Sequence, residues 1–223
     1  MHIKQQKKEN KEMQKDQKEI HKEVYQKSEK MAMKEAKKLE KEGWKTMGLP
    51  IAKQLDATWM KMYDHEPNGD PRYIPAQVMA TANTFAAAQS QADNVAKLRI
   101  ASQISSSVAA LTDVALANRE ISAKEAASIT KTVENAKVIV SQKLGRTFKT
   151  MEIYQELSNG NYRVRVTMFY DLKAAVAIAR EVMLEELKTD SEVNKAQLEK
   201  LLGMDKLTEQ VAKDMPQYDE IAE

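Results

Sequence analysis

Hydrophobic positions are spaced so differently in residues 1–42 and in the rest of the chain that the two parts predict different structures. The first part is rich in Lys and Glu and contains neither Gly nor Pro, which favours a helix. Its apolar residues recur at spacings of seven, four and seven positions, close to a heptad seam: Met13, Ile20, Val24 and Met31. Gln17 and Lys27 interrupt that seam. The charged arm is therefore interpreted either as a solvated helix or as a seam that meets a partner or a second copy.

Residues 43–72 are predicted to form a short helix followed by a loop. Gly43 is suited to end the arm helix, and Pro50 is suited to the first turn of the next one. The candidate interaction residues of this segment are its large aromatic side chains: Trp44, Trp59 and Tyr63. They could form a docking patch or anchor the short helix to the domain. We favour the anchoring role, because large apolar groups usually lie inside a protein.

Residues 73–188 carry the pattern of a core domain that begins with a strand and two helices. Apolar and polar residues alternate from Tyr73, and Pro75 places the early part of this strand at the edge of a sheet or outside it. A helical stripe runs from Ala86 to about Ala117. Its first half is mostly alanine and is therefore expected to approach another backbone closely. The sequence Ser122-Ala123-Lys124-Glu125 is a capping box that begins the second helix.

An Asn-Gly pair at positions 159 and 160 predicts a β-hairpin with a type I′ turn. The pairs expected on one side of that hairpin are Leu157–Tyr162, Ile153–Val166 and Met151–Met168. On the other side Glu156 would face Arg163 as a pair of opposite charges. Asp171 is a natural N-cap for the closing helix.

The order strand, helix, helix, strand, strand, helix predicts an α+β fold. Helices would pack on one small antiparallel sheet, and a long charged helix would precede the domain. Residues 189–223 continue a weaker helical pattern that Gly203 interrupts. We expect them to form a helical and partly loose C-terminal tail.

Charge and composition exclude several classes of function. Residues 1–42 hold 13 Lys against 9 Asp and Glu, yet the whole chain has a net charge of only +2. The interleaved acidic residues argue against a nucleic-acid partner, which favours a surface of one sign. No apolar run reaches the ~18 residues of a transmembrane span, and no signal peptide follows Met1. The absence of cysteine excludes disulfides, thiol catalysis and thiolate metal sites.

No constellation of catalytic residues is present in the pattern, so a non-enzymatic protein without cofactor or metal is expected. His65 lies in an acidic loop, but zinc would need more converging nitrogen or sulfur ligands. The serines at positions 105–107 have no histidine within the predicted core to activate them. The 6 glycines form no phosphate-binding loop.

Two stretches resemble the Lpp-twenty-like family of bacterial envelope lipoproteins and the related N-terminal domain of the flagellar assembly protein FlgT. One runs from Ala80-Thr81-Ala82-Asn83-Thr84 into the helix with its repeated Ala-x-x-x-Ala spacing. The other runs from Ile153-Tyr154-Gln155-Glu156-Leu157 through Gly160-Asn161-Tyr162-Arg163-Val164 to Tyr170-Asp171. The resemblance covers roughly residues 73–188. It implies a dodecin-like core, export to the periplasm or outer membrane, and no enzymatic site. The chain lacks the family's lipobox cysteine, so membrane association would need a lipid anchor that is not visible here.

Three hypotheses about function follow from these observations. The first is a non-enzymatic cell-envelope protein that acts through protein contacts. The second is a cytosolic adaptor or assembly subunit that oligomerises through the N-terminal helix. The third, electrostatic binding of an anionic surface by the arm's lysines, is weakened by the interleaved glutamates.

Overall fold

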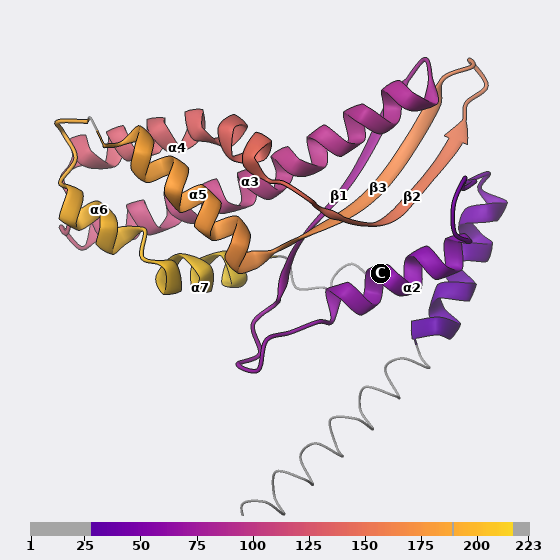
Figure 1. The fold of residues 1–223 in the computed structure, drawn as a ribbon, viewed down its shortest axis with the longest axis horizontal. Coiled ribbons are helices and arrows are strands. Elements are labelled where there is room, and N and C mark those ends of the chain that lie inside the picture. The colour runs from indigo at the N-terminus through magenta and orange to yellow at the C-terminus, as the bar shows by residue number, and fades with distance from the viewer. Residues whose placement is uncertain (1–27, 189, 216–223) are drawn as a thin grey trace, which may run out of the picture.

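The computed structural model describes residues 28–188 and 190–215, which form an α+β fold (Figure 1). Residues 28–41 are helical. The elements that follow are α2 (Ile51–Met62), β1 (Tyr73–Ala82), α3 (Phe85–Ala117), α4 (Ala123–Lys143), β2 (Phe148–Glu156), β3 (Tyr162–Asp171), α5 (Leu172–Glu186), α6 (Lys195–Leu201) and α7 (Met204–Asp214). The predicted order of strands and helices in the core is thereby confirmed.

The three strands form one antiparallel sheet in the order β1-β3-β2, with β3 in the centre. Pro75 lies on β1, an edge strand, as its missing N–H group predicts. Alternate side chains of β1 and β3 point to the face that α3 covers, where Val78 and Val166 are buried. The other face lies against α2 and the helix of residues 28–41, and Met151 and Ile153 of β2 are buried there.

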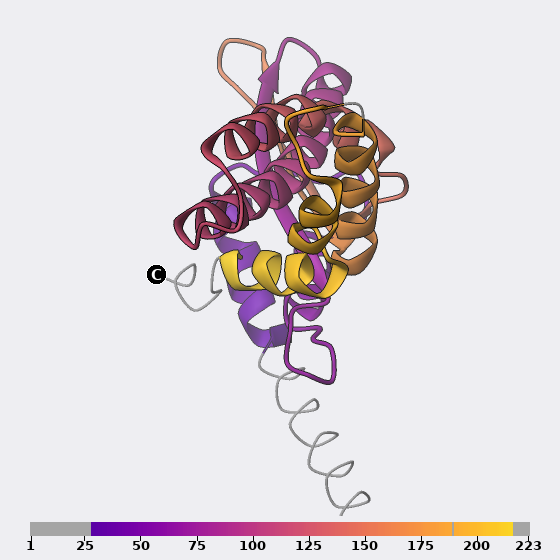
Figure 2. The same ribbon diagram turned by 90° about the vertical axis from the view of Figure 1, so that its left-hand side faces the viewer.

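Helix α3 joins the sheet to a group of helices at its far end (Figure 1), and Figure 2 looks onto that helical end. Ala88, Ala92 and Ala96 are each 0% exposed, which confirms that the alanine half packs closely. Further along, Ile100 and Ile104 share the core of α4, α5 and α7. The composition and length of α3 would suffice to cross a membrane, but half of its most apolar stretch is buried inside the protein. That burial is typical of a core helix.

The segment that follows residue 189 packs into the main core. Leu198 and Leu202 belong to the same buried cluster as α3 and the sheet, and so do Leu207 and Val211 of α7. Both helices are short, and α6 depends on Asn194, which caps its first backbone N–H groups. The weak helical pattern of the sequence thus reflects two short helices that gain their stability from tertiary packing.

Local capping signals place the helix starts where the sequence predicts them. Ser122 Oγ accepts a hydrogen bond from the Glu125 N–H, and the Glu125 carboxylate accepts one from the Ser122 N–H. Hydrogen bonds to the Glu125 carboxylate from the N–H and side chain of Ser122 and from the Asn194 N–H lower the pKa of Glu125. Asp171 accepts a hydrogen bond from the Ala174 N–H and caps α5. The starts of α4 and α5 are each fixed by a side chain within three residues, so sequence alone identifies them.

The hairpin forms, but the predicted turn type and register are wrong. Gly160 has φ of 81°, whereas Asn159 is not among the described non-glycine residues with positive φ. A type I′ turn needs positive φ at both positions. Instead, the Gly160 N–H donates to the Leu157 carbonyl oxygen, and the Leu157 N–H donates to the Asn161 carbonyl oxygen. These bonds give a longer turn that ends with a left-handed glycine. The observed pairing shifts by one residue, with Ile153 opposite Arg165 and Glu156 opposite Tyr162.

That shift reverses the faces of β2 relative to the predicted hairpin. Ile153 packs against the N-terminal helices, while Val166 packs against α3, so they do not share a face. Leu157–Tyr162 and Met151–Met168 are likewise not opposite each other, and neither are Glu156 and Arg163. A second irregularity between Lys149 and Met151 shifts the register again near the start of β2.

Replacing Gly160 with alanine is expected to lower the free energy of unfolding by about 1–2 kcal/mol, the cost of a left-handed conformation at an L-residue. No atom lies within 4 Å of the added Cβ, so the backbone conformation alone would account for the loss. Gly145 is a matched control, because its Cβ position is also open and its φ is not left-handed. Urea unfolding of both alanine variants would test this, and equal stabilities would contradict the turn assignment.

Candidate protein-interaction surface

Residues 28–63 form a layer on one face of the sheet, here called the N-terminal layer (Figure 1). Its first helix ends at Gly43, which has φ of 89°. The Trp44 N–H donates to the Leu39 carbonyl (3.0 Å) and the Gly43 N–H donates to the Glu40 carbonyl (3.1 Å). This pair of bonds is the Schellman motif, so the prediction that Gly43 ends the helix is confirmed.

A small second core holds the N-terminal layer to the sheet. Ala32, Ala36 and Leu39 line one stripe of the first helix and are at most 3% exposed. They meet Trp44, Ile51 and Leu55 of the layer and Met151 and Ile153 of β2. The sequence pattern drew attention to the methionines of this helix and missed the buried alanines. Alanines four residues apart, followed by a leucine three residues on, would have been the signal for this stripe.

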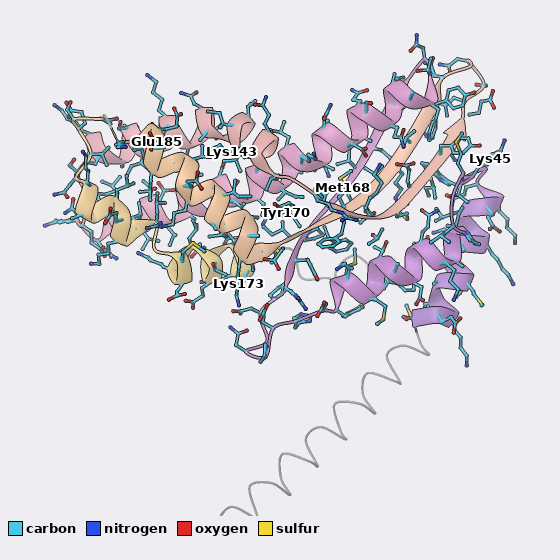
Figure 3. The ribbon with its side chains drawn as sticks, viewed as in Figure 1. Lys45, Lys143, Met168, Tyr170, Lys173 and Glu185 are labelled. Carbon is cyan, nitrogen blue, oxygen red and sulfur yellow. The ribbon has the colours of Figure 1, made fainter. Side chains whose placement is uncertain are left out.

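Backbone and side-chain hydrogen bonds fix the layer along the outer edge of β2. Lys45 and Tyr154 exchange backbone N–H···O bonds, each 2.8 Å long, at the place labelled in Figure 3. The Gln54 Oε1 atom accepts a hydrogen bond from the Glu152 N–H (2.6 Å). The Gln54 Nε2 atom donates to the carbonyl oxygen of Leu49 (2.7 Å). These bonds cover this edge of the sheet and satisfy both backbone groups of Tyr154 and the N–H group of Glu152.

Several large apolar side chains of the N-terminal layer remain exposed, although its inner side is buried. The exposed fractions are 56% for Met31, 51% for Met33, 68% for Met47, 67% for Leu49 and 55% for Tyr63. Single exposed apolar residues are common, but five within one short layer are a stronger signal for binding. Methionine is well suited to such a surface, because its flexible side chain adapts to different partners.

The residues that the sequence predicted as an interaction surface have different positions. Met31 and Tyr63 are exposed, whereas Trp44 is only 7% exposed and Trp59 packs partly buried against the same small core. The burial of Trp44 and Trp59 fits the anchoring role, whereas the exposed Tyr63 does not fit it. Met13, Ile20 and Val24 lie outside the described residues. Met47 and Leu49 were missed, because the short connection that carries them has no periodicity that marks their exposure.

Arg165 lies on the sheet face that the N-terminal layer partly covers. Burial lowers the pKa of this arginine, and the carboxylates of Glu35 and Glu42 partly offset that effect. Its side chain forms no ion pair or hydrogen bond with any residue that the structure describes. The guanidinium remains charged at neutral pH, because arginine titrates far above it. Arg165 therefore adds positive charge to the sheet face beside the layer.

On the opposite face a lysine is held by two carboxylates. Lys149 Nζ lies 2.8 Å from Asp93 Oδ2 and 2.5 Å from Glu152 Oε2. Burial alone would lower the pKa of Lys149, but its hydrogen bonds to Asp93 and Glu152 outweigh burial and raise it. A lysine that stays protonated is a poor nucleophile. The arrangement thus joins β2 to α3 and does not create a reactive amine.

The remaining candidates for chemistry are dispersed. His65 Nδ1 is hydrogen-bonded to the Tyr63 carbonyl oxygen in the loop before β1. Ser107 Oγ donates to the carboxylate of Asp214, and no histidine lies between residues 66 and 215 to activate it. Within residues 28–188 and 190–215, no group of three His, Cys, Asp or Glu side chains is arranged to hold a metal ion.

A groove of about 600 Å³ lies between α5 and the α6–α7 segment. Leu184, Leu187 and Leu198 provide apolar surface, and Arg180 and Lys195 provide charge. Its lining resembles the general protein surface rather than the mostly apolar lining of a small-molecule site.

Comparison of the chain with protein-family models, curated proteins and solved structures finds no match.

Proposed function

We propose that this chain is a non-enzymatic cell-envelope protein, periplasmic or associated with the outer membrane, that acts through protein contacts. The exposed apolar side chains of the N-terminal layer are the observation that carries the proposal. The envelope location rests on the resemblance to the Lpp-twenty-like family.

The layer is suited to present a binding surface because its inner side is fixed to the sheet. Its inner side contributes to a closed core, and its connection pairs with β2 through Lys45. Met47 and Leu49 lie between that pairing and α2, so both ends of their connection are fixed. A fixed backbone with adaptable side chains lowers the ordering cost of binding. The Gly48 N–H donates to Thr46 Oγ1, which further orders this turn.

The test is a photocrosslinking amino acid placed at Met47 in the full chain, followed by fractionation of cells of the native host. We expect a covalent adduct in the envelope fraction, and loss of that adduct when Leu49 is also changed to Glu. Val138 on α4 is a matched control site, because it is also apolar and is 54% exposed. Equal crosslinking at Val138, or a protein confined to the cytoplasmic fraction, would contradict the proposal.

One observation supports the second candidate, a cytosolic adaptor that oligomerises through the N-terminal helix. Met31, the member of the proposed seam that the structure describes, is exposed and is not used in the small core. If the seam is an assembly element, Met31→Glu should weaken self-association of the full chain. An unchanged mass by sedimentation equilibrium would count against this candidate.

A further inference from the structure

The two edge strands of the sheet, β2 and β1, differ in how far other residues cover their outward backbone groups. The outer edge of β2 is covered by Lys45, by Gln54 and by Gln155, whose side chain donates to the Glu42 carbonyl (2.8 Å). Among the described residues, the outer edge of β1 is covered less, with one side-chain hydrogen bond to its backbone, from Arg99 to the Gln77 carbonyl oxygen. Proteins normally protect such an edge, because unpaired backbone groups can template another strand.

The direction of the backbone groups on β1 follows from two contacts. Tyr154 directs its backbone N–H and C=O groups away from β3, where they bond to Lys45. Its cross-strand partner Val164 therefore directs its own N–H and C=O groups away from β2, toward β1. Val164 lies opposite Ala80, which places the even-numbered residues of β1 in the pairs that bond to β3. The Gln77 carbonyl oxygen accepts a hydrogen bond from Arg99 Nη1 (2.6 Å), as expected for a residue that points outward.

Gln77, Met79 and Thr81 therefore direct their backbone groups away from the sheet. The N–H and C=O groups of Met79 and Thr81 form no hydrogen bond within residues 28–188 and 190–215. The three side chains are exposed, Met79 to 59%. Pro75 shares their outward direction, but it has no N–H group to offer and limits the free edge on that side.

β1 itself is uncharged, although the Arg99 side chain of α3 reaches its edge at Gln77. No Lys, Arg, Asp or Glu occurs in β1, although charged residues are the usual means of blocking an edge strand. In an antiparallel pair of identical strands related by a two-fold axis, the residue on the axis lies opposite its own copy. A charged residue at that position would lie opposite a like charge, which destabilises the pair. β1 has no charged residue and avoids this repulsion.

We propose that β1 pairs with β1 of a second copy, antiparallel and with the two-fold axis at Met79. In this register Met79 lies opposite Met79, and Gln77 lies opposite Thr81, so an amide meets a hydroxyl. All three residues then lie in hydrogen-bonded pairs, once Arg99 releases the Gln77 carbonyl oxygen. Arg99 is an exposed side chain and can move aside. The two copies would thus form one continuous sheet.

This β1–β1 dimer is separate from the proposed function and depends neither on the envelope location nor on the partner. It uses β1, whereas the adaptor hypothesis uses the N-terminal helix. A short strand pair buries less than the ~1,200 Å² of a standard interface, so we expect a weak dimer whose population depends on concentration.

The decisive variant is Met79→Glu in the full chain. In the monomer, the new carboxylate lies opposite Arg165 and forms a favourable cross-strand pair, so the fold is retained. In the dimer, two carboxylates meet at the two-fold axis. Sedimentation equilibrium should show dimerisation weakened at least about tenfold, equivalent to ~1.4 kcal/mol. Met79→Leu keeps the apolar side chain and should dimerise as the unchanged protein does.

Hydrogen exchange of the same samples identifies the interface. The Met79 and Thr81 amides should exchange rapidly in dilute solution and become protected as the dimer forms. A protein that stays monomeric at high concentration would overturn the inference. A dimer in which these amides stay unprotected, or one that Met31→Glu dissociates and Met79→Glu does not, would overturn it as well.

Discussion

Replacing Trp44 with alanine is expected to lower the free energy of unfolding by about 3–5 kcal/mol, as for other large aromatic residues removed from a core. Trp44 is 7% exposed and packs with Leu39 and Ile51, so its loss leaves a cavity at the junction of layer and sheet. The cores that hold the layer and α3 are separate clusters. The layer should therefore separate from the sheet at a lower urea concentration than the rest of the protein unfolds.

Trp59→Ala is the matched control for this prediction. Trp59 is only partly buried at the margin of the same core, so its removal should cost less than about 2 kcal/mol. Urea unfolding followed by far-ultraviolet circular dichroism measures both variants. If Trp44→Ala cost less than about 1 kcal/mol while binding of a partner were lost, Trp44 would be a docking residue and the anchoring role would be wrong.

Most of the fold could be predicted from the sequence because its signals are local. The capping box at Ser122, the N-cap at Asp171 and the terminating Gly43 each act within a few residues. The alanine stripe of α3 similarly indicated close packing before its neighbour was known. Such signals depend on backbone geometry that the local sequence controls, so they place element ends and faces well.

The register of the hairpin could not be predicted from the same kind of signal. An Asn-Gly pair fits two turn types, and they differ by one residue in the pairing that follows. Tertiary packing selects the observed one, because Ile153 fills the small core under the N-terminal layer while Val166 fills the core under α3. The sequence pattern did not reveal that β2 is covered on both faces.

The candidate surface was only partly accessible to prediction for a related reason. Apolar side chains near Trp44 could be buried or exposed, and the choice depends on how the layer docks. The hydrogen bond from the Glu152 N–H to Gln54 sets the position of α2 over the edge of β2. It links residues 98 positions apart, and no local pattern encodes it. Met47 and Leu49 are exposed as a result of that long-range arrangement.

The second large effect is expected where α3 lies against the sheet. Ala92→Leu should lower the free energy of unfolding by about 1–3 kcal/mol or more, because added methylene groups must displace a well-packed backbone or neighbour. Ala92 is 0% exposed, and it lies between Ala88 and Ala96 on the stripe that faces β1 and β3. The substitution leaves helix propensity nearly unchanged, so packing accounts for the loss.

Ala86→Leu on the same helix separates packing from helix propensity. Ala86 is exposed, so the same change there should alter stability by no more than about 0.5 kcal/mol. Thermal and urea unfolding of both variants provide the comparison. If Ala92→Leu matched Ala86→Leu, α3 would not approach the sheet closely, and the repeated alanine spacing would need another explanation. If only Ala92→Leu were destabilised, the spacing would be a packing requirement of the fold, so it could recur in unrelated chains with the same helix-on-sheet contact.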